Sequence, residues 1–229
     1  MKKILILGGN SDIGIELVEC LTQNENIEVH LHYRKNFLNK KKFKKCKLIK
    51  KDLNNINIKN LKNYFDNDYD IIVNLVGYVS KQSFADFQID EIQKTILINS
   101  LIPFLIIRHS LKHMENKKFG RIINTSSVGV KFGGGLNTFS YSLSKHINEF
   151  IPIEMQKLCS KNVLYNTLRI GVTNTKFHKK VINKSVKKRI GLIPIKKMAT
   201  TKDIAKYIKF LIYENNYVTN QIINITGGE

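Results

Sequence analysis

The segment ILILGGNSDIG, residues 4–14, contains the pattern of a strand, a tight turn and a helix start. Its four aliphatic residues predict a buried strand, and the small residues after them allow the backbone to turn. Gly8 permits the tight turn, and Gly14 lets the next helix pack closely with its N-terminus directed at phosphate groups. The segment therefore indicates a dinucleotide site, with a flexible loop as the alternative interpretation.

Short β-branched or leucine-rich runs recur after this segment, and stretches of helical pattern separate them. Strands that alternate with helices form parallel sheets, and right-handed crossovers place helices on both faces. We therefore predict an α/β fold with a single Rossmann-like, doubly wound, mainly seven-stranded parallel sheet. The expected strands are residues 4–7, 29–32, 48–49, 70–74, 121–125, 163–168 and 221–225.

The composition favours one globular domain over residues 1–229, because 42% of the residues are hydrophobic, 24% are charged, and no linker or composition shift divides the chain. No apolar run approaches the roughly 18 residues that span a bilayer, and the N-terminus is too short in apolar residues for a signal peptide. Three scattered cysteines suggest neither a disulfide framework nor a zinc site. We expect a cytoplasmic protein with no membrane partner.

The formal net charge of +20 raises the question of nucleic acid, since excess Lys and Arg bind phosphates. Only five of the 38 basic residues are Arg, however, and no nucleic-acid fold signature accompanies them. We interpret the charge as compositional drift and expect no nucleic-acid partner. The dense basic run at residues 40–51 is either a solvated face or a surface for an acidic ligand.

The second expected strand ends at His32-Tyr33-Arg34-Lys35, where an acidic residue would usually hold the ribose hydroxyls of NAD. No acidic residue stands there. Arg34 offers a guanidinium fork for the 2′-phosphate of NADP, with Lys35 as a second cation. This favours NADP(H) over NAD(H), and a solvated pair is the alternative.

Hydroxyl groups follow the strand at 121–125, at the sheet edge where ligands of such folds bind. Tyr141 comes fourteen residues after Ser127, and Lys145 lies one helical turn beyond Tyr141 if a helix begins there. An ammonium beside a phenol favours the phenolate and lowers the pKa of the tyrosine. The pair is common by chance, so its weight depends on its context.

These motifs stand together in the order and approximate spacing of the short-chain dehydrogenase/reductase family, which the chain resembles over essentially its whole length. Within the family, the chain resembles members similar to 3-oxoacyl-acyl-carrier-protein reductases. The matching segments are residues 8–14, 74–77, 99, 126–127, 141–145, 170–175 and 225–228.

The resemblance implies catalytic roles for four residues. Tyr141 would donate a proton to the carbonyl oxygen, and Lys145 would lower the pKa of Tyr141 and hold the nicotinamide ribose. Ser127 would hydrogen-bond the substrate oxygen, with Ser126 as the less favoured candidate. Asn99 would hold a water in a proton relay to Lys145, and its alternative role is a buried amide at a helix kink before Pro103.

The resemblance also implies a cofactor-binding set spread over five loops, and no metal site. Asp52 and Leu53 would contact the adenine, Asn74 would brace the sheet, and Gly171, Thr173 and Thr175 would cover the carboxamide. A substrate lid is expected around residues 174–195, where His178, Lys179 and Lys180 would meet an acidic substrate or face water. The full set is Gly8, Asn10, Ser11, Ile13, Gly14, Arg34, Asp52, Leu53, Asn74, Gly77, Tyr141, Lys145, Gly171, Thr173 and Thr175.

Four departures from the family pattern bear on cofactor affinity and pocket shape. Asp12 replaces the middle glycine of the turn, where a carboxylate opposes a pyrophosphate unless it points away or caps the helix. Leu75 and Val76 replace smaller residues, and Ile170 replaces a proline. The chain ends at Glu229, without the tail that some relatives carry.

The expected activity is that of an NAD(P)(H)-dependent carbonyl reductase or alcohol dehydrogenase acting on a small-molecule or carrier-linked carbonyl. A non-catalytic dinucleotide sensor or scaffold is the alternative, and an extended-branch epimerase is disfavoured by length. The helix at 91–114 is apolar nearly all round its middle, which predicts a homodimer or homotetramer through helices 91–114 and 141–159. His109 and His113 share a helix face but lack a third metal ligand.

Overall fold

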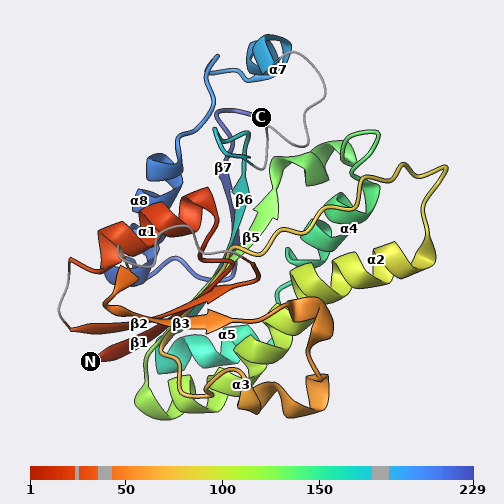
Figure 1. The fold of residues 1–229 in the computed structure, drawn as a ribbon. Helices are drawn as coiled ribbons and strands as arrows, with labels where there is room; N and C mark the ends of the chain where they lie inside the picture. Colours follow the sequence, from red (N-terminus) through yellow and green to blue (C-terminus); the bar gives the residue numbers. More distant parts are fainter. Residues whose placement is uncertain (24–25, 36–42, 177–185) are drawn as a thin grey trace.

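The computed structural model describes residues 1–23, 26–35, 43–176 and 186–229. At its centre is one parallel sheet of seven strands in the order β3-β2-β1-β4-β5-β6-β7 (Figure 1). This sheet confirms the predicted fold class, and each expected strand is present. The strands are β1 (Lys2–Leu7), β2 (Ile27–Tyr33), β3 (Cys46–Lys50), β4 (Ile71–Asn74), β5 (Gly120–Ser127), β6 (Val163–Ile170) and β7 (Gln221–Ile225).

Helices cover both faces of the sheet, because each parallel connection must cross over one face. Helices α1 and α8 pack together on one face, while α3 and α5 pack on the other, where α2 also contacts α4. The helices are α1 (Asp12–Leu21), α2 (Ile89–Ile96), α3 (Ile102–Lys117), α4 (Phe139–Ile147), α5 (Glu154–Leu158), α7 (Val186–Leu192) and α8 (Thr201–Tyr213). Short 3-10 helices lie in the connections between these elements, namely η2 (Leu53–Asn55), η3 (Ile58–Asn63), η5 (Val128–Phe132) and η6 (Cys159–Lys161).

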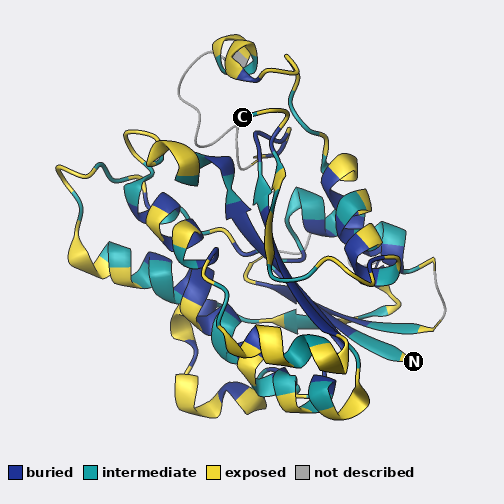
Figure 2. Ribbon diagram, turned by 180° about the vertical axis from the view of Figure 1, so that it is seen from behind, coloured by how far each residue is buried: buried dark blue, intermediate teal, exposed yellow. Residues whose placement is uncertain are grey.

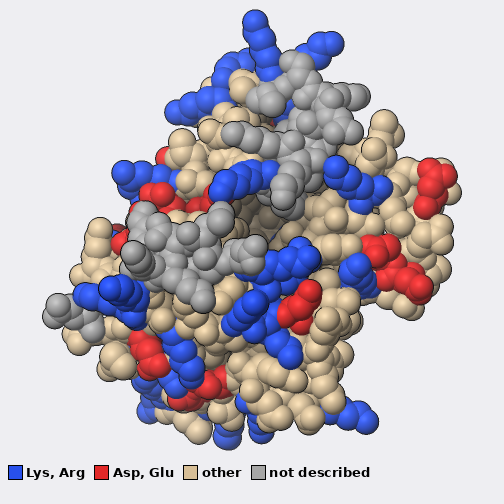
Figure 3. Space-filling model, viewed as in Figure 1, with Lys and Arg blue, Asp and Glu red and all other residues tan. Residues whose placement is uncertain are grey.

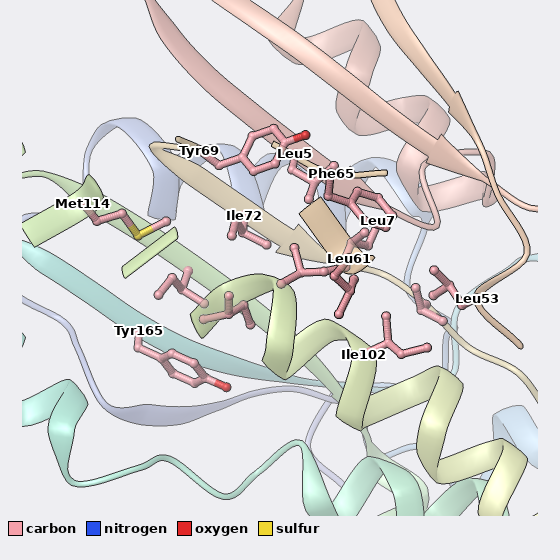
Figure 4. Close-up of a cluster of buried hydrophobic side chains, with 14 of the residues drawn as sticks. Leu5, Leu7, Leu53, Leu61, Phe65, Tyr69, Ile72, Ile102, Met114 and Tyr165 are labelled. Carbon is pink, nitrogen blue, oxygen red and sulfur yellow. The ribbon is translucent and has the colours of Figure 1, made fainter. Parts of the chain in front are cut away.

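The core has two layers, because successive side chains of a strand point to opposite faces. Ile4 and Ile6 join the cluster beneath α1 and α8. Leu5 and Leu7 join the cluster beneath α3, which also contains Tyr165 (Figure 4). Figure 2 shows the sheet as the most deeply buried part of the molecule, with exposed residues on the outer helix faces. Packing on both faces therefore fixes the position of the strands and of the edge at which they end.

The helical region around the predicted segment 91–114 runs from α2 into α3 through a single π-helical turn, η4 (Leu97–Leu101). Pro103 lies within this continuous helical run and has no N–H to donate to the Asn99 carbonyl one turn earlier, which instead accepts from the Asn148 Nδ2 at 3.1 Å. The π turn carries one extra residue per turn and so rotates Asn99 relative to its neighbours. Asn99 and Ser100 are fully buried there.

The predicted helix at 141–159 is wrong as a continuous element. Helix α4 ends at Ile147 and α5 begins at Glu154. Pro152 lies between them. A proline ring disfavours the helical conformation of the residue before it, so the helix does not continue through this position. By contrast, the sequence Thr200-Thr201-Lys202-Asp203 has the spacing of a capping box, and the structure forms one: the Thr200 hydroxyl accepts from the Asp203 N–H and Asp203 accepts from the Thr200 N–H.

No helix within the described ranges is both long and apolar enough to cross a membrane.

Candidate active site

The residues expected to bind and react lie along one edge of the sheet, at the carboxyl ends of its strands. The glycine turn follows β1, Arg34 follows β2, and Asp52 follows β3. Ser127 ends β5, and Gly171 begins the segment after β6. Parallel strands bring their carboxyl ends to a common edge, so loops distant in sequence form one site there.

Lys145 lies on α4 with its ammonium buried among oxygen atoms. Its Nζ donates to the carbonyl oxygens of Val76 at 2.8 Å and Thr125 at 3.1 Å, and to the Thr125 hydroxyl at 3.3 Å. These three acceptors match the three protons of an ammonium. Burial lowers the pKa of Lys145 to about 7. Thr125 was not among the predicted site residues, although it directly precedes the two serines at the end of β5.

Tyr141 stands in the first turn of α4, one turn before Lys145. The Lys145 Nζ is 5.9 Å from the centroid of the Tyr141 ring. Burial raises the pKa of Tyr141 to about 12, and a hydrogen bond with the Ser127 side chain acts in the opposite direction. In this arrangement, therefore, the hydroxyl of Ser127 and not the ammonium is the group that favours the phenolate.

The two serines at the end of β5 have different partners. Ser126 is buried and donates to the Glu149 Oε1 at 2.7 Å, while Arg169 binds the same carboxylate through two nitrogens. Ser127 is half-buried, accepts from the Gly129 N–H at 3.2 Å and bonds to Tyr141. Of the two hydroxyls, only that of Ser127 faces the phenol.

Asn99 uses its side chain to join α4 to the loop after β4. Its Oδ1 accepts from the Tyr78 N–H at 2.7 Å, and its Nδ2 donates to the Tyr78 carbonyl and the Ser144 hydroxyl, both at 2.9 Å. The Asn99 carbonyl accepts from the Asn148 Nδ2 at 3.1 Å. These side-chain contacts fit the alternative role given for Asn99, that of a buried amide at an irregularity of the helix.

A buried polar network behind Lys145 was not foreseen. Asn74 donates to the Asn124 Oδ1 at 2.7 Å, and Asn124 donates to the Tyr165 hydroxyl at 3.1 Å. Asn148 donates to the Thr125 carbonyl, which Lys145 also binds. Asn148 lies three residues after Lys145 on the same helical face, and that spacing was the available signal. Asn74 braces β4 against β5 as expected of it.

The glycine turn has the geometry of a phosphate cradle. Gly8 adopts a left-handed φ of 71°, which few other residues tolerate. A Cβ on Gly14 would lie 2.5 Å from the Gly9 carbonyl oxygen. Ser11 caps α1 by accepting from the Gly14 N–H, which leaves the other N–H groups of the first turn directed at the sheet edge. Asn10, Ser11 and Ile13 would therefore hold a pyrophosphate through this turn.

Asp12 is directed across the site toward the segment that follows β6. Its carboxylate accepts from the Lys176 backbone N–H at 2.7 Å, and the Lys176 ammonium is 3.9 Å away. Asp12 also occupies the first turn of α1, where a negative charge stabilises the helix. The carboxylate thus has partners of its own, as the departure from a glycine required.

The residues expected near the adenosine lie at the ends of β2 and β3. Arg34 and Lys35 are exposed directly after β2. The Asp52 carboxylate accepts from the Asn54 N–H at 3.0 Å and so caps η2, while Leu53 is buried in the core. Asp52 therefore forms an Asx turn that sets the position of the loop.

The segment after β6 packs tightly against the end of β7. A Cβ on Gly171 would lie 2.7 Å from the Thr226 Cα. The Thr173 hydroxyl donates to the Gly171 carbonyl at 3.0 Å, and Thr175 donates to the Thr173 carbonyl at 3.4 Å. Gly77 is exposed at the end of the turn after β4. His178, Lys179, Lys180 and much of the expected lid lie outside the described residues.

Metal ligation finds no support in the described ranges, which contain no group of three or more His, Cys, Asp or Glu side chains able to hold an ion. His113 instead bonds to the buried Asp70 carboxylate at 3.0 Å.

The family model described as "Enoyl-(Acyl carrier protein) reductase" matches residues 24–229. The chain belongs to the short-chain dehydrogenase/reductase family. It is accordingly an oxidoreductase with a Rossmann fold that uses a nicotinamide dinucleotide. Reactions at carbonyl or hydroxyl groups are the common theme of its relatives' names.

Curated relatives of this short-chain dehydrogenase/reductase include two 3-oxoacyl-[acyl-carrier-protein] reductases. The protein of Buchnera aphidicola subsp. Baizongia pistaciae is 27% identical, over 99% of this chain and 97% of its own length. That of Aquifex aeolicus is 28% identical over 69% of this chain, a match that spans only 64% of the relative's length.

Solved structures of the family superpose over nearly the whole chain. A 4-hydroxyisoleucine dehydrogenase mutant, complexed with NADH and succinate, has a TM-score of 0.87 at 25% identity and covers 99% of this chain and 98% of its own. ElxO with NADP bound has a TM-score of 0.82 at 24% identity, with the same coverage, and supports the fold alone.

Proposed function

We propose that the protein is an NADP(H)-dependent carbonyl reductase or alcohol dehydrogenase with Tyr141 as its general acid and base. The observation that carries the proposal is the Tyr141 phenol, which bonds to the Ser127 hydroxyl and has the Lys145 ammonium 5.9 Å from its ring centroid. A hydroxyl and a phenol that share one hydrogen bond can both bind a single carbonyl oxygen. Ser127 and Tyr141 lie at the same edge of the sheet as the glycine turn after β1.

The bound nicotinamide supplies or accepts the hydride, which is chemistry that no side chain provides. Ser127 orients the substrate oxygen, and Tyr141 delivers the proton to it. Lys145 holds a positive charge beside the phenol and would exchange backbone oxygens for ribose hydroxyls. Asn99 bonds to Ser144 on α4, and Asn148 bonds to the Asn99 carbonyl. These contacts hold α4, and with it Tyr141 and Lys145, in position.

The direction of the pKa of Tyr141 suits reduction. At neutral pH a phenol whose pKa is raised to about 12 keeps its proton, and carbonyl reduction consumes that proton. Alcohol oxidation needs the phenolate, so its rate should rise with pH. In this arrangement the Ser127 hydroxyl, which bonds to the Tyr141 phenol, is the group that eases this deprotonation.

NADPH is the proposed reductant because Arg34 and Lys35 place two exposed cations at the end of β2 and no acidic residue stands there. The proposed substrate is a ketone, either a small molecule or a 3-oxoacyl thioester on an acidic carrier. Two observations support the carrier, namely the names of the relatives and the many Lys and Arg side chains around the face in Figure 3.

We also propose a homodimer or homotetramer through the helical segments 89–117 and 139–158. Large apolar side chains remain exposed on them and beside them, including Ile89 at 61%, Leu101 at 46%, Phe150 at 69% and Ile153 at 60%. Large apolar side chains that stay exposed on helices of one protein favour association. Light scattering at micromolar concentration should give at least twice the chain mass, and a monomeric mass would contradict the proposal.

The test of the reaction is a panel of ketones and 3-oxoacyl thioesters, followed by loss of NADPH absorbance. Tyr141→Phe should lower turnover at least about a hundredfold, because general acid catalysis contributes about 10²–10⁴, while NADP⁺ binding stays within about threefold. Tyr217→Phe is the matched control, since Tyr217 is 93% exposed. Turnover retained in Tyr141→Phe would remove the tyrosine from the mechanism.

A non-catalytic dinucleotide sensor is the second candidate, favoured by an ammonium already satisfied by three protein oxygens. NADP⁺ binding without turnover on any member of the panel would support this alternative and reject the reductase.

A further inference from the structure

One buried histidine connects the two loops that face the adenosine end of the site. His32, on β2, is 3% exposed. Its Nδ1 lies 3.2 Å from the Gly8 backbone nitrogen, and its Nε2 lies 2.9 Å from the Lys51 carbonyl oxygen. Its own carbonyl accepts from the Gly9 N–H at 2.9 Å. His32 thus bonds to Gly8 and Gly9 in the glycine turn and to Lys51, the residue before Asp52.

The partners of His32 allow only one protonation state. A backbone N–H can only donate, so the Nδ1 facing Gly8 must be an unprotonated acceptor. A carbonyl can only accept, so the Nε2 facing Lys51 must carry the proton. The imidazole is therefore neutral and in its Nε2–H tautomer. An imidazolium would direct a second N–H at the Gly8 N–H and break that contact.

We propose that His32 is a positioning residue for the cofactor, whose neutral Nε2–H imidazole holds the glycine turn and the loop after β3 at a fixed separation. The proposal rests on the proposed dinucleotide site, because the turn faces the pyrophosphate and the loop faces the adenine. In this proposal the His32 side chain does not contact the cofactor itself. The histidine acts through the backbone of Gly8 and of Lys51.

The surroundings of His32 keep it neutral at physiological pH. Burial lowers its pKa, while the hydrogen bond to Lys51 and the negative charge of Asp52 oppose this shift. The Phe65 ring packs edge-on against the imidazole at 5.7 Å. The titratable residues on the segments beside it are His30 on β2, Arg34 directly after β2, Lys50, Lys51 and Asp52 at the end of β3, and Tyr64 and Asp66 next to Phe65; residues 4–9 of β1 and its turn contribute none.

The sign of the pH effect follows from the lowered pKa. An unfolded histidine titrates near pH 6.5, and His32 in the folded chain titrates below that value. The arrangement of the two loops is therefore complete above about pH 6.5 and is lost as the pH falls through the lower folded value. Cofactor affinity should fall with it.

The first experiment measures NADP⁺ binding by calorimetry between pH 5.5 and 7.5. An Asn side chain can supply an acceptor to Gly8, and a Gln side chain can supply a donor to Lys51, but neither titrates. The wild type should lose about tenfold more affinity on acidification than His32→Asn or His32→Gln, the loss expected for one unmade buried hydrogen bond. His32→Phe should bind at least about tenfold more weakly at every pH.

Comparison between variants removes the titration of the ligand, because the 2′-phosphate of NADP⁺ also titrates near pH 6. His30→Gln is the matched control, since His30 is equally buried on β2 but bonds to Tyr69 and Glu28 away from the turn. His30→Gln should keep the wild-type profile. Equal profiles for the wild type and His32→Asn would overturn the proposal, whereas no NADP⁺ binding by the wild type would instead overturn the proposed function.

A second measurement reads the tautomer directly. In the ¹⁵N-histidine-labelled protein, long-range ¹H–¹⁵N correlation spectra distinguish a protonated from an unprotonated ring nitrogen. The signal absent from His32→Asn identifies His32. An unprotonated Nδ1 with a protonated Nε2 supports the proposal, and a proton on Nδ1 at pH 7.5 overturns it.

Discussion

The two halves of the sheet edge are built in different ways. The half formed by β4, β5, β6 and α4 carries its chemistry on side chains, with Tyr141, Lys145 and Ser127 around one small volume. The half formed by β1, β2 and β3 works through backbone groups, such as the N–H groups of the glycine turn. Reaction chemistry therefore restricts residue identity, whereas a phosphate cradle restricts mainly backbone shape. This explains why a departure such as Asp12, in the first turn of α1, is compatible with the same fold.

Removal of the buried ammonium should have the largest effect on the reaction half. Lys145→Met keeps the length of the side chain but leaves the Val76 and Thr125 carbonyls without a donor. We expect turnover with NADPH to fall about a thousandfold. Lys206→Met, at an exposed position of α8, is the control. If Lys145→Met kept turnover within tenfold of the wild type, the reaction half would not depend on this side chain, and the division between the two halves would be wrong.

A methyl group in the cradle should disable the other half. In Gly14→Ala the new Cβ would meet the Gly9 backbone at 2.5 Å, so the turn must open. NADP⁺ affinity should fall about a hundredfold, and the free energy of unfolding by about 1–3 kcal/mol. Gly191→Ala is the control, because no atom of the residues that the structure describes lies within 4 Å of its Cβ position. Calorimetry and urea unfolding measure the two effects, and unchanged binding in Gly14→Ala would refute the cradle.

Cofactor choice should depend on a single exposed cation. Arg34→Asp replaces a partner for the 2′-phosphate with one for the ribose hydroxyls. The ratio of kcat/KM for NADPH to that for NADH should fall about tenfold to a hundredfold. Arg108→Asp, exposed on α3, should leave the ratio unchanged. An unaltered ratio in Arg34→Asp would exclude this residue from the site.

The smallest expected effect concerns the departure at Asp12. Asp12→Asn keeps an oxygen for the Lys176 N–H but removes the charge. The free energy of unfolding should fall by about 0.3–1 kcal/mol, because the α1 N-terminus loses a favourable charge, while NADP⁺ affinity rises about twofold. Glu16→Gln, one turn along α1, controls for net charge. A weaker NADP⁺ affinity in Asp12→Asn alone would mean that the carboxylate helps to hold the site.

Prediction from sequence was most successful where the signal is local. Aliphatic runs marked each strand, and the Thr200 capping box marked the start of α8. It was least successful for helix continuity, because the break between α4 and α5 requires Pro152 to be weighed against apolar neighbours on both sides. The π turn at Leu97–Leu101 is marked by Pro103, which predicts an irregularity in the helix but not its type. The extra residue there is stabilised by the buried contacts of Asn99 and Ser100.

For the site, resemblance supplied the residue types but not their partners. Tyr141 and Lys145 are four residues apart, so a helix alone brings them together. The choice of Ser127 over Ser126 depends on Glu149, which takes up the Ser126 hydroxyl. Likewise, Asn148 reaches the carbonyls of Asn99 and Thr125 only after two strands and two helices have packed.

By itself, the sequence determined the parallel α/β sheet, the edge at which its ligand sites lie and the residues able to carry proton transfer. These follow from hydrophobic periodicity and from spacings of a few residues, which local geometry converts into faces and turns. Only the tertiary structure decided which oxygens surround Lys145, where the Asp12 carboxylate points and which tautomer His32 adopts. Those properties depend on hydrogen bonds between segments far apart in the chain, and burial makes an unmatched donor or acceptor costly enough to enforce them.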